Sequence, residues 1–317
     1  MKKYLCLLII ILFSCNNRDE NKIAIVIHGG AGIILKENIS KSKEDSIINK
    51  LDEAISKGWE LLKKGKSSEM AVIETIKILE DSPLFNAGKG SVFNSEGKVE
   101  NDASIMRGND LNAGASSGTS NVKNPITLAA NIMNHSEHVF LSGKGAENFA
   151  KNRNLKIVNN EYFHTKFRYN QLLNKKDEDK YGTVGCVAID VNGNIVAGTS
   201  TGGMTNKKWG RIGDSPIIGA GTYANNSTCG ISSTGSGEYF IRTVAAYQVS
   251  SLLENHNYDL KKAMYKVIHE KIGGIGGDGG MIGIDKNSNI LMEFNTPGMY
   301  RAYVNKYGEK EILLYEK

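Results

Sequence analysis

The chain of 317 residues is 40% hydrophobic and 23% charged, an ordinary composition for a globular protein with a substantial core. Its formal net charge of +5 is spread along the sequence, and no basic stripe interleaved with aromatic residues occurs, which argues against nucleic-acid binding. The 35 glycines fall in discrete clusters, as expected for tight turns and close backbone approaches rather than a low-complexity tract.

The N-terminus has the pattern of an export signal. Two lysines precede the apolar run YLCLLIIILF, which is too short to span a bilayer as a mature helix. Residues 12–15 (LFSC) are similar to a lipoprotein box in which Cys15 becomes the lipidated first residue, although Phe13 is bulkier than usual there. We therefore expect a lipid-anchored protein facing the periplasm or exterior, with a polar tether over residues 16–22. A plain secretory signal and a soluble product are the alternative.

The first half of the chain alternates between one strand pattern and several helix patterns. The β-branched run IAIVIH (23–28) predicts a buried strand, and HGGAG (28–32) a loop that exposes backbone N–H groups. Apolar residues at helical spacing predict helices over residues 40–64 and 68–80. A cap and a first-turn proline at 124–125 start another helix. Residues 152–182 lose periodicity and end in a charged run, so we expect a mobile linker there.

The second half follows a different pattern. Residues 184–190 and 194–199 alternate around an Asn-Gly turn, which predicts a β-hairpin, and a comparable unit recurs at 279–294. Helices are expected near residues 237–254 and 259–271. Strands joined by hairpins, with helices grouped apart, favour antiparallel sheets covered by helices over a doubly wound parallel fold.

Several familiar motifs are absent or misplaced. The sequence GIGGDG (274–279) fits GxGxxG, but it follows a helix and precedes a strand, the reverse of a dinucleotide-binding turn, so we interpret it as a tight connection. No HExxH, CxxC or Walker sequence occurs, and the six histidines are scattered. Apart from Cys6 and Cys15 of the leader, the cysteines are Cys186 and Cys229. We expect both to be buried free thiols, with a single disulfide as the alternative.

The junction at Gly182-Thr183 suggests a chemistry of its own, because a strand pattern begins there directly after the charged run. If the chain were cut at this bond, Thr183 would carry an α-amino group with a pKa of roughly 7.7–8.0. Such an amine can accept the proton of the adjacent hydroxyl near neutral pH, so nucleophile and base would share one residue.

Several blocks of the sequence resemble the plant-type asparaginase/isoaspartyl peptidase family of N-terminal nucleophile hydrolases. These are HGGAG at 28, LEDSPLFNAGKGSVFN at 79, DASIM at 102, GTVGCVAIDVNGNIVAGTSTGGMTNKKWGRIGDSPIIGAGTYANN at 182, STGSGE at 233 and FNTPGMYRA at 294. The resemblance covers nearly everything after the leader. It implies an α+β fold with a four-layer αββα sandwich, two antiparallel sheets flanked by helices. It also implies autocatalytic cleavage between Gly182 and Thr183 into an α chain (23–182) and a β chain (183–317) that form one domain.

The resemblance also implies roles for the residues around the cleavage point. Thr183 matches the nucleophile, and Thr201 matches the residue that hydrogen-bonds near it and tunes it. Thr234 with the backbone N–H of Gly235 matches the oxyanion hole, where donors face the oxygen that gains negative charge. Asn86 matches a residue that supports the active site.

A second group of residues matches the substrate-binding part of the family's site. Arg211 and Asp214 match the pair that binds the α-carboxylate and α-ammonium of the substrate, with a backbone contact from Gly237. A guanidinium suits a carboxylate and a carboxylate suits an ammonium, so this pair selects a free aspartyl α end. An isolated Arg-x-x-Asp would by itself be read as a solvated surface pair.

The resemblance implies no cofactor for the chemistry. It implies a possible structural sodium ion bound by backbone carbonyls of the loop containing Glu80, Phe85 and Ala87, and a homodimer of αβ units. The expected partner is a small molecule or dipeptide: the enzyme would hydrolyse β-aspartyl dipeptides and L-asparagine to release aspartate.

Two other functions remain open. A glycosylasparaginase would act on glycosylated asparagine, but such enzymes usually carry Asp before the nucleophile, whereas this chain has Gly182. A non-catalytic surface lipoprotein could retain the scaffold as a binding module, but the complete set of threonines with Arg211 and Asp214 argues against it.

Overall fold

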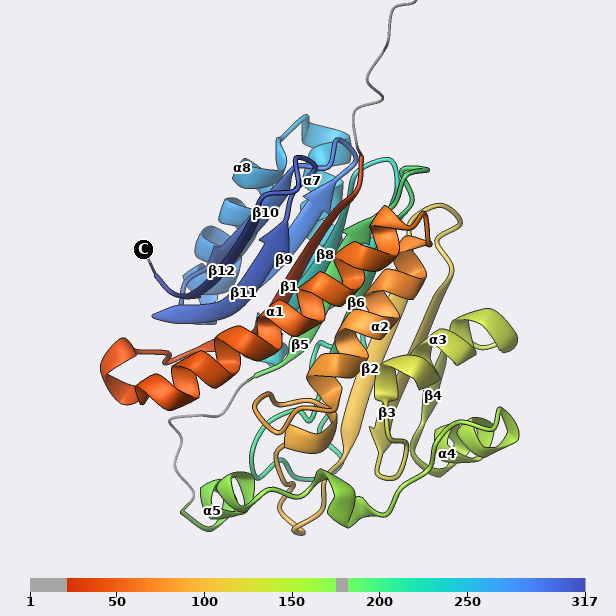
Figure 1. Ribbon diagram of the computed structural model, residues 1–317, viewed down its shortest axis with the longest axis vertical. Helices are drawn as coiled ribbons and strands as arrows, with labels where there is room; N and C mark the ends of the chain where they lie inside the picture. Colours follow the sequence, from red (N-terminus) through yellow and green to blue (C-terminus); the bar gives the residue numbers. More distant parts are fainter. Residues whose placement is uncertain (1–21, 175–181, 317) are drawn as a thin grey trace, which may run out of the picture.

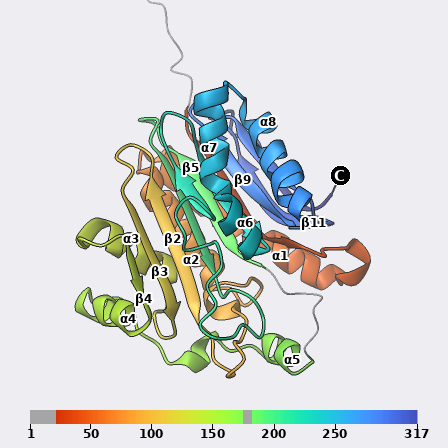
Figure 2. The ribbon, with the colours of Figure 1, turned by 180° about the vertical axis from the view of Figure 1, so that it is seen from behind.

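The computed structural model describes residues 22–174 and 182–316, in which two β-sheets lie face to face between two layers of helices (Figures 1 and 2). The larger sheet has eight strands. In spatial order they are β12 (Lys310–Tyr315), β11 (Gly298–Val304), β1 (Ala24–Gly32), β5 (Val184–Ile189), β6 (Ile195–Thr201), β2 (Asn101–Arg107), β3 (Ala113–Thr119) and β4 (Phe140–Ser142). The smaller sheet has the order β10 (Ile290–Phe294), β9 (Gly279–Asp285), β8 (Cys229–Gly235) and β7 (Thr222–Ala224).

Each sheet has its own helical layer. The large sheet is covered by α1 (Lys41–Lys63), α2 (Ser68–Glu80) and α3 (Pro125–His135). The small sheet is covered by α6 (Gly237–Thr243), α7 (Ala245–His256) and α8 (Leu260–Tyr265), which continues into a π-helical turn over Lys266–Ile272. Two peripheral helices, α4 (Gly143–Asn152) and α5 (Lys166–Asn174), and 3-10 turns at Lys36–Asn38, Gly88–Gly90, Asn160–Phe163 and Gly273–Ile275 complete the described elements. The αββα sandwich is thereby confirmed.

One strand pair departs from the expected antiparallel arrangement. β4 runs parallel to β3, whereas the remaining pairs of both sheets are antiparallel. The reason is local: α3 follows β3 and precedes β4, and a helical crossover returns the chain in the same direction.

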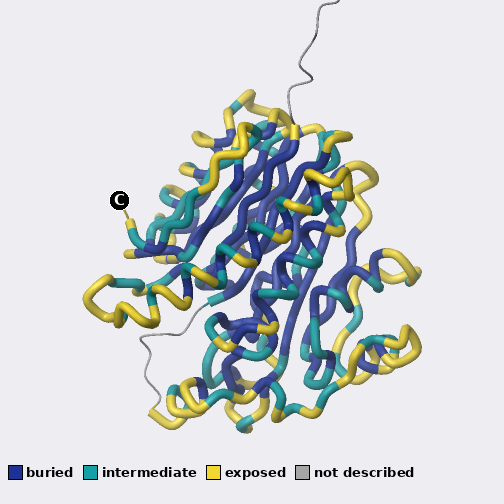
Figure 3. Tube along the Cα trace, viewed as in Figure 1, coloured by how far each residue is buried: buried dark blue, intermediate teal, exposed yellow. Residues whose placement is uncertain are grey.

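Burial on both faces explains why β1 is continuously apolar. Ile25 and Ile27 belong to the core beneath α1 and α2, while Ala24 and Val26 belong to the core between the two sheets. Successive strand residues point to opposite faces, so a central strand of a sandwich has no solvent face to fill with polar residues. Each fully buried isoleucine contributes about 1.5–3 kcal/mol relative to an exposed one. The inner strands are accordingly the most buried part of the molecule (Figure 3).

The predicted helix starts are confirmed, and serine caps precede two of the helices. The hydroxyl of Ser40 accepts a hydrogen bond from the backbone N–H of Lys43 at the start of α1, and Ser67 does the same for Met70 at α2. Pro125 occupies the first turn of α3 as predicted, but the predicted cap, Asn124, makes no side-chain capping hydrogen bond. The predicted hairpin is present as β5 and β6, and its turn includes Gly193 at a φ of 77°.

The prediction of a loop at HGGAG is wrong, because these residues continue β1 to Gly32. The strand pairs with β11 throughout and carries a bulge between His28 and Gly30. Gly30 has a φ of 114°, and a Cβ placed there would lie 3.2 Å from Cα of Gly182. Glycine thus lets β1 pass directly against the Gly182-Thr183 peptide.

The prediction of a mobile linker also fails for the part of it that is described. Residues 152–174 contain the 3-10 turn Asn160–Phe163 and helix α5. Phe163 is fully buried in a cluster with Phe93 and Val99, and Nε of Arg168 donates to the carbonyl of Gly90 at 2.8 Å. These contacts anchor the segment although it lacks helical periodicity. The charged residues 175–181 lie outside the described residues, as do the leader and Cys15.

The predicted cleavage point lies directly before β5, one of the central strands of the large sheet. β5 begins one residue after Thr183 and pairs with β1 on one side and β6 on the other. Strands from before and after residue 182 therefore interleave in one sheet, so a cut there would leave both chains held by backbone hydrogen bonds.

The remaining sequence predictions can be compared directly with the described residues. GIGGDG connects the 3-10 turn Gly273–Ile275 to β9, as expected. Cys186 and Cys229 are buried free thiols whose pKa values are raised by burial. Within residues 22–174 and 182–316, none of the helices combines the length and apolar character needed to cross a membrane.

Candidate active site

The site centres on Thr183, which lies directly across from Thr201. Val184 pairs with Ser200 in the β5–β6 ladder, so the next pair along places the two threonines opposite each other on one face. Their hydroxyl oxygens are 3.1 Å apart, and both residues are at most 5% exposed. The short β-hairpin therefore fixes the distance between the predicted nucleophile and the residue predicted to tune it.

The carbonyl oxygen of Gly182 is surrounded by hydrogen-bond donors. Nδ2 of Asn86 lies 2.9 Å away, Oγ1 of Thr201 3.0 Å and Oγ1 of Thr183 2.7 Å. The single hydroxyl hydrogen of Thr183 can go to this carbonyl or to Thr201. When it goes to Thr201, the hydroxyl of Thr201 can donate in turn to the carbonyl. Asn86 and Thr201 then polarise the Gly182 carbonyl, beside which Thr183 Oγ1 lies.

Asn86 is oriented by a network from the loop that follows α2. Its Nδ2 also donates to the carbonyl of Gly203 at 2.7 Å, and its Oδ1 accepts from the backbone N–H of Val92 at 3.0 Å. The backbone carbonyl of Asn86 accepts from the N–H of Gly202 at 3.1 Å. Because the amide is bonded at both ends, its rotation is fixed with Nδ2 toward Gly182.

His28 is a contributor that sequence reasoning missed. Its Nδ1 lies 3.1 Å from the carbonyl of Thr183, and its Nε2 lies 3.0 Å from Oγ of Ser232. A carbonyl can only accept, so Nδ1 carries the hydrogen and Nε2 accepts from the serine. Burial lowers the pKa of His28 to about 3, outweighing the opposing effect of the Thr183 carbonyl, so the ring is neutral. Its place at the end of the predicted strand, directly before a glycine run, was the available signal.

Behind His28, buried hydroxyls connect the two sheets. Ser232 is 2.7 Å from Thr199, which accepts from Thr222 at 2.5 Å, and Thr222 accepts from Ser104 at 2.8 Å. The chain of bonds runs from β2 through β7, β6 and β8, in that order, to His28 and so to the backbone of Thr183. It supports the backbone of Thr183, the predicted nucleophile, through its carbonyl.

The predicted substrate-binding pair is brought close to Thr183. Arg211, Asp214 and Thr183 line one small pocket. Asp214 is 4% exposed, its Oδ2 has no hydrogen-bond partner among the described residues, and burial raises its pKa to about 7. A Cβ on Gly237 would lie 2.8 Å from Oδ1 of Asp214 and 3.1 Å from Nη2 of Arg211, so only glycine fits there.

Glu238, which sequence reasoning did not single out, engages one edge of the Arg211 guanidinium. Its carboxylate accepts from Nε at 2.8 Å and from Nη2 at 2.9 Å, a bidentate ion pair. Nη1 points elsewhere: a Cβ on Gly213 would lie 2.9 Å from it, and one on Gly203 3.5 Å. Gly203 and Gly213 both line the pocket, so Nη1, the nitrogen not paired with Glu238, lies near its wall. The only signal for Glu238 was its place at the end of STGSGE.

In the uncut chain the pocket is nearly filled. Its volume is about 10 Å³, room for about one water molecule, and its lining residues are Gly182, Thr183, Thr201, Gly203, Arg211, Gly213, Asp214, Ser215 and Gly235. Gly182 is thus itself part of the wall. With Gly182 in place, the pocket has no room for a ligand the size of asparagine.

The two predicted oxyanion-hole residues are placed differently. Gly235 lines the pocket, with a φ of 141°. Thr234 is fully buried outside the lining, and its hydroxyl accepts from the N–H of Ala31 at 3.4 Å. The structure therefore brings Gly235, but not the hydroxyl of Thr234, to the pocket surface next to Thr183.

The loop after α2, where the resemblance implies a sodium ion, packs closely against backbone carbonyls. A Cβ on Gly88 would lie 2.4 Å from the carbonyl oxygen of Glu80, and one on Gly90 would lie 2.1 Å from that of Phe85. The loop therefore folds back on its own carbonyls, and such oxygens suit a hard cation. The carbonyl of Ala87 is already bonded to the N–H of Gly90 at 3.3 Å. In the described part of the chain, no group of three or more His, Cys, Asp and Glu side chains could hold a metal.

Comparison with known proteins gives consistent similarities over nearly the whole chain. A family model described as asparaginase matches residues 21–314. The chain is 45% identical to an isoaspartyl peptidase of Escherichia coli (strain K12), over 89% of this chain and 92% of that protein. It is 45% identical to a putative isoaspartyl peptidase/L-asparaginase of Dictyostelium discoideum (90% and 94% covered). It is 41% identical to a plant-type L-asparaginase of Pyrococcus furiosus (91% and 98% covered).

Proposed function

This chain belongs to the asparaginase family, and from that premise we propose that it is a self-cleaving threonine hydrolase that releases aspartate from β-aspartyl dipeptides and L-asparagine. One observation supports this proposal above the others. Thr183 Oγ1 lies beside the Gly182 carbonyl, and the oxygen of that carbonyl accepts hydrogen bonds from Asn86 and Thr201. None of the relatives described above is named a glycosylasparaginase, so nothing favours that alternative.

In the self-cleavage step, Thr183 Oγ1 attacks the carbonyl carbon of Gly182. Its proton passes to the departing amide nitrogen of Thr183 as the C–N bond breaks, leaving an ester between Gly182 and the threonine oxygen. Water hydrolyses this ester to give the carboxylate of Gly182, the restored hydroxyl and the free α-amino group of Thr183. The donors Asn86 and Thr201 stabilise the negative charge that develops on the carbonyl oxygen.

After cleavage the same residues serve hydrolysis. The Thr183 amine accepts the hydroxyl proton, Oγ1 attacks the β-carbonyl of the substrate, and the proton leaves with ammonia or the amino group of the leaving residue. Water then releases aspartate from the acyl-enzyme. The α-carboxylate binds Arg211 through Nη1 while Glu238 holds the opposite edge, and the ionised carboxyl of Asp214 binds the α-ammonium. The N–H of Gly235 is the donor next to the reacting carbonyl.

The proposal is tested by incubating the purified protein, separating it by denaturing electrophoresis and sequencing the fragments from their N-termini. We expect two bands, one beginning TVGCVAID, and release of aspartate from a β-aspartyl dipeptide and from asparagine. Thr183→Ala is expected to remain uncut and inactive. A wild-type protein that stays a single chain, or a Thr183→Ala variant that is cut normally, would refute the proposal, and a clear preference for glycosylated asparagine would change the substrate.

We further propose a sodium ion bound by the backbone carbonyls of Glu80, Phe85 and Ala87. Such an ion would stabilise the loop that presents Asn86 without entering the chemistry. Thermal unfolding in sodium chloride is then expected to occur at a higher temperature than in choline chloride at equal ionic strength. Equal melting temperatures would remove the ion from the proposal.

Two proposals concern the state of the protein in the cell. We propose that residues 1–15 direct export and that Cys15 carries a lipid anchor, so a labelled fatty acid should be incorporated by the full chain and not by Cys15→Ser. We also propose that two αβ units associate as a homodimer, which light scattering of the cleaved protein tests through the mass in solution. Unlabelled wild-type protein would contradict the anchor, and the mass of a single αβ unit would contradict the dimer.

A further inference from the structure

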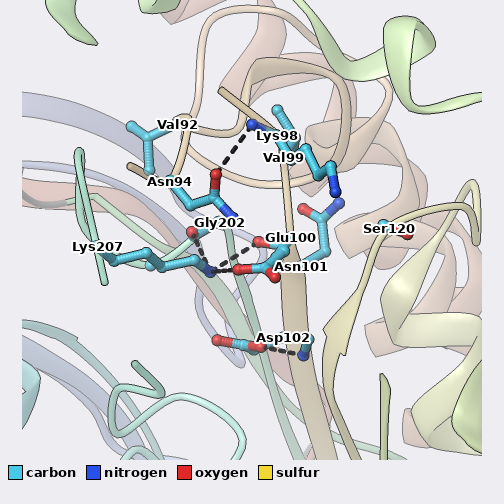
Figure 4. Close-up of polar contacts among 12 residues, drawn as sticks. Val92, Asn94, Lys98, Val99, Glu100, Asn101, Asp102, Ser120, Gly202 and Lys207 are labelled. Carbon is cyan, nitrogen blue, oxygen red and sulfur yellow. Dashed lines mark hydrogen bonds and ion pairs between the residues drawn. The ribbon is translucent and has the colours of Figure 1, made fainter. Parts of the chain in front are cut away.

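Lys207 is a buried cation that neither the proposed chemistry nor the substrate-binding pair uses. The residue is 3% exposed, and its Nζ lies 3.0 Å from the carbonyl of Gly202 and 3.0 Å from that of Glu100 (Figure 4). The carboxylate of Glu100 is a further 3.8 Å neighbour. A buried ammonium needs such partners because its desolvation is costly. Two of them are backbone carbonyls, so the lysine fixes the chain as well as balancing a charge.

The backbone that Lys207 holds is the turn at Gly202-Gly203, which contacts both donors of the Gly182 carbonyl. The N–H of Gly203 donates to Oγ1 of Thr201 at 3.0 Å, and its carbonyl accepts from Nδ2 of Asn86 at 2.7 Å. The N–H of Gly202 donates to the carbonyl of Asn86 at 3.1 Å. A shift of this turn would therefore misplace Thr201 and Asn86 together.

The lysine side chain also packs directly against the turn. Gly203 has a φ of 79°, and a Cβ there would lie 3.2 Å from Cδ and 3.3 Å from Nζ of Lys207. The stem of the lysine thus fills the space that a side chain at position 203 would occupy. The ammonium donates to the carbonyl of Gly202, while the aliphatic part of the side chain packs against Gly203.

The ammonium of Lys207 also compensates the negative charge of nearby carboxyls. Asp102 of β2 pairs in register with Thr201 of β6; it is 1% exposed, and its Oδ1 accepts from the N–H of Gly118 at 2.8 Å. Burial raises its pKa, and the positive charges of Lys207 and Arg211 oppose that rise. The carboxyls that interact with the ammonium are therefore those of Glu100 and Asp102. Removing Lys207 would leave two carboxyls behind the Thr201 strand with less compensation.

We propose that Lys207 is a positioning residue: it fastens the Gly202-Gly203 turn so that Thr201 and Asn86 are aimed at the Gly182 carbonyl. It acts first in self-cleavage and afterwards in turnover. This inference rests on the proposed function. Lys207 touches neither the scissile peptide nor the substrate, so it acts only through the turn.

The test compares Lys207→Met with Lys208→Met, a matched change at the exposed neighbouring lysine. The full chain is made by cell-free translation, and conversion to two fragments is followed over time by electrophoresis. Displacing a donor by about 1 Å, or losing one at an oxyanion, costs on the order of 10²-fold, so we expect folded Lys207→Met to cleave roughly 10- to 100-fold more slowly. Lys208→Met should match the wild type, and Lys207→Arg should recover part of the loss.

Steady-state kinetics of the cleaved proteins separate positioning from general stability. In Lys207→Met, kcat for a β-aspartyl dipeptide is expected to fall roughly 10-fold or more, with KM within about 3-fold, because Arg211 and Asp214 still bind the substrate. A lysine that only stabilised the fold would lower the melting temperature without changing the cleavage rate of folded molecules. Folded Lys207→Met that cleaves and turns over at wild-type rates would overturn the inference.

A second variant decides the question if Lys207→Met does not fold. Gly203→Ala places a methyl group against Lys207 while leaving every charge in place, and it is expected to slow self-cleavage by the same factor. Normal cleavage by folded Gly203→Ala would refute the role of the turn. These outcomes differ from failure of the proposed function, in which the wild type itself would neither cleave nor release aspartate.

Discussion

The substitution Thr201→Val removes one hydroxyl from the centre of the site and leaves its shape unchanged. Valine has nearly the same volume as threonine, so no cavity forms and the β6 ladder is preserved. Three hydrogen bonds disappear: the donation to the Gly182 carbonyl at 3.0 Å and the acceptances from Thr183 Oγ1 and the Gly203 N–H at 3.1 and 3.0 Å. The perturbation therefore tests the hydroxyl rather than the packing.

The expected effect on rate is larger than the effect on stability. Loss of one donor to a developing oxyanion lowers a rate by about 10²–10³, or roughly 2.7–4 kcal/mol of activation free energy. The buried N–H of Gly203 left without a partner costs about 1–3 kcal/mol of folding free energy. A domain with large apolar cores beneath and between its sheets is expected to remain folded after such a loss.

The assay is a time course of self-cleavage after cell-free synthesis, read by electrophoresis, with urea unfolding of the uncut protein as the stability measurement. Thr201→Ser retains the hydroxyl and should cleave within about 10-fold of the wild type. Thr201→Val should be at least 100-fold slower while still unfolding cooperatively. If folded Thr201→Val cleaves at the wild-type rate, the donor set at the Gly182 carbonyl does not drive the reaction.

Two further predictions concern protonation. Because burial raises the pKa of Asp214 to about 7, its carboxyl is protonated below that pH and cannot pair with an ammonium. The KM of the cleaved enzyme should therefore fall as the pH rises through about 7. A KM that does not change with pH would contradict the role of Asp214. The pKa of His28 is about 3 in the folded state and 6.5 without burial. Between these pH values the unfolded state binds more protons than the folded state, so the free energy of unfolding should decrease as the pH falls from 6.5 towards 3. Urea unfolding at about pH 7 and pH 4 should show this loss for the wild type and a smaller one for His28→Asn, which retains a donor toward the Thr183 carbonyl; equal losses would refute the assignment.

The helices and the central strands could be predicted because their signals are local. Ser40 and Ser67 cap the helices that follow them, and the apolar stripe of each helix lies within one segment. The alternation in β5 and β6, with glycine at the turn, defines a hairpin without reference to the rest of the chain. A loop was wrongly predicted at HGGAG because glycines are usual in turns. Here the glycines lie in a strand, and the absence of a side chain at Gly30 lets the Gly182 backbone pack against it. A mobile linker was wrongly predicted over residues 152–174 because the contacts that fix this segment are with Phe93 and Gly90, which are distant in sequence.

The sequence by itself determined the main helices, the β5–β6 hairpin, the family and the position of Thr183 before a strand, because periodicity and contiguous motifs lie in neighbouring residues. Only the tertiary structure decided that Asn86 reaches Gly182, that His28 holds the carbonyl of Thr183 and that Glu238 and Lys207 support the site. These partners are 96 residues apart in the first case and 155 in the second. No local pattern specifies such a contact, since it exists only once burial has stacked the two sheets and brought the strand ends together.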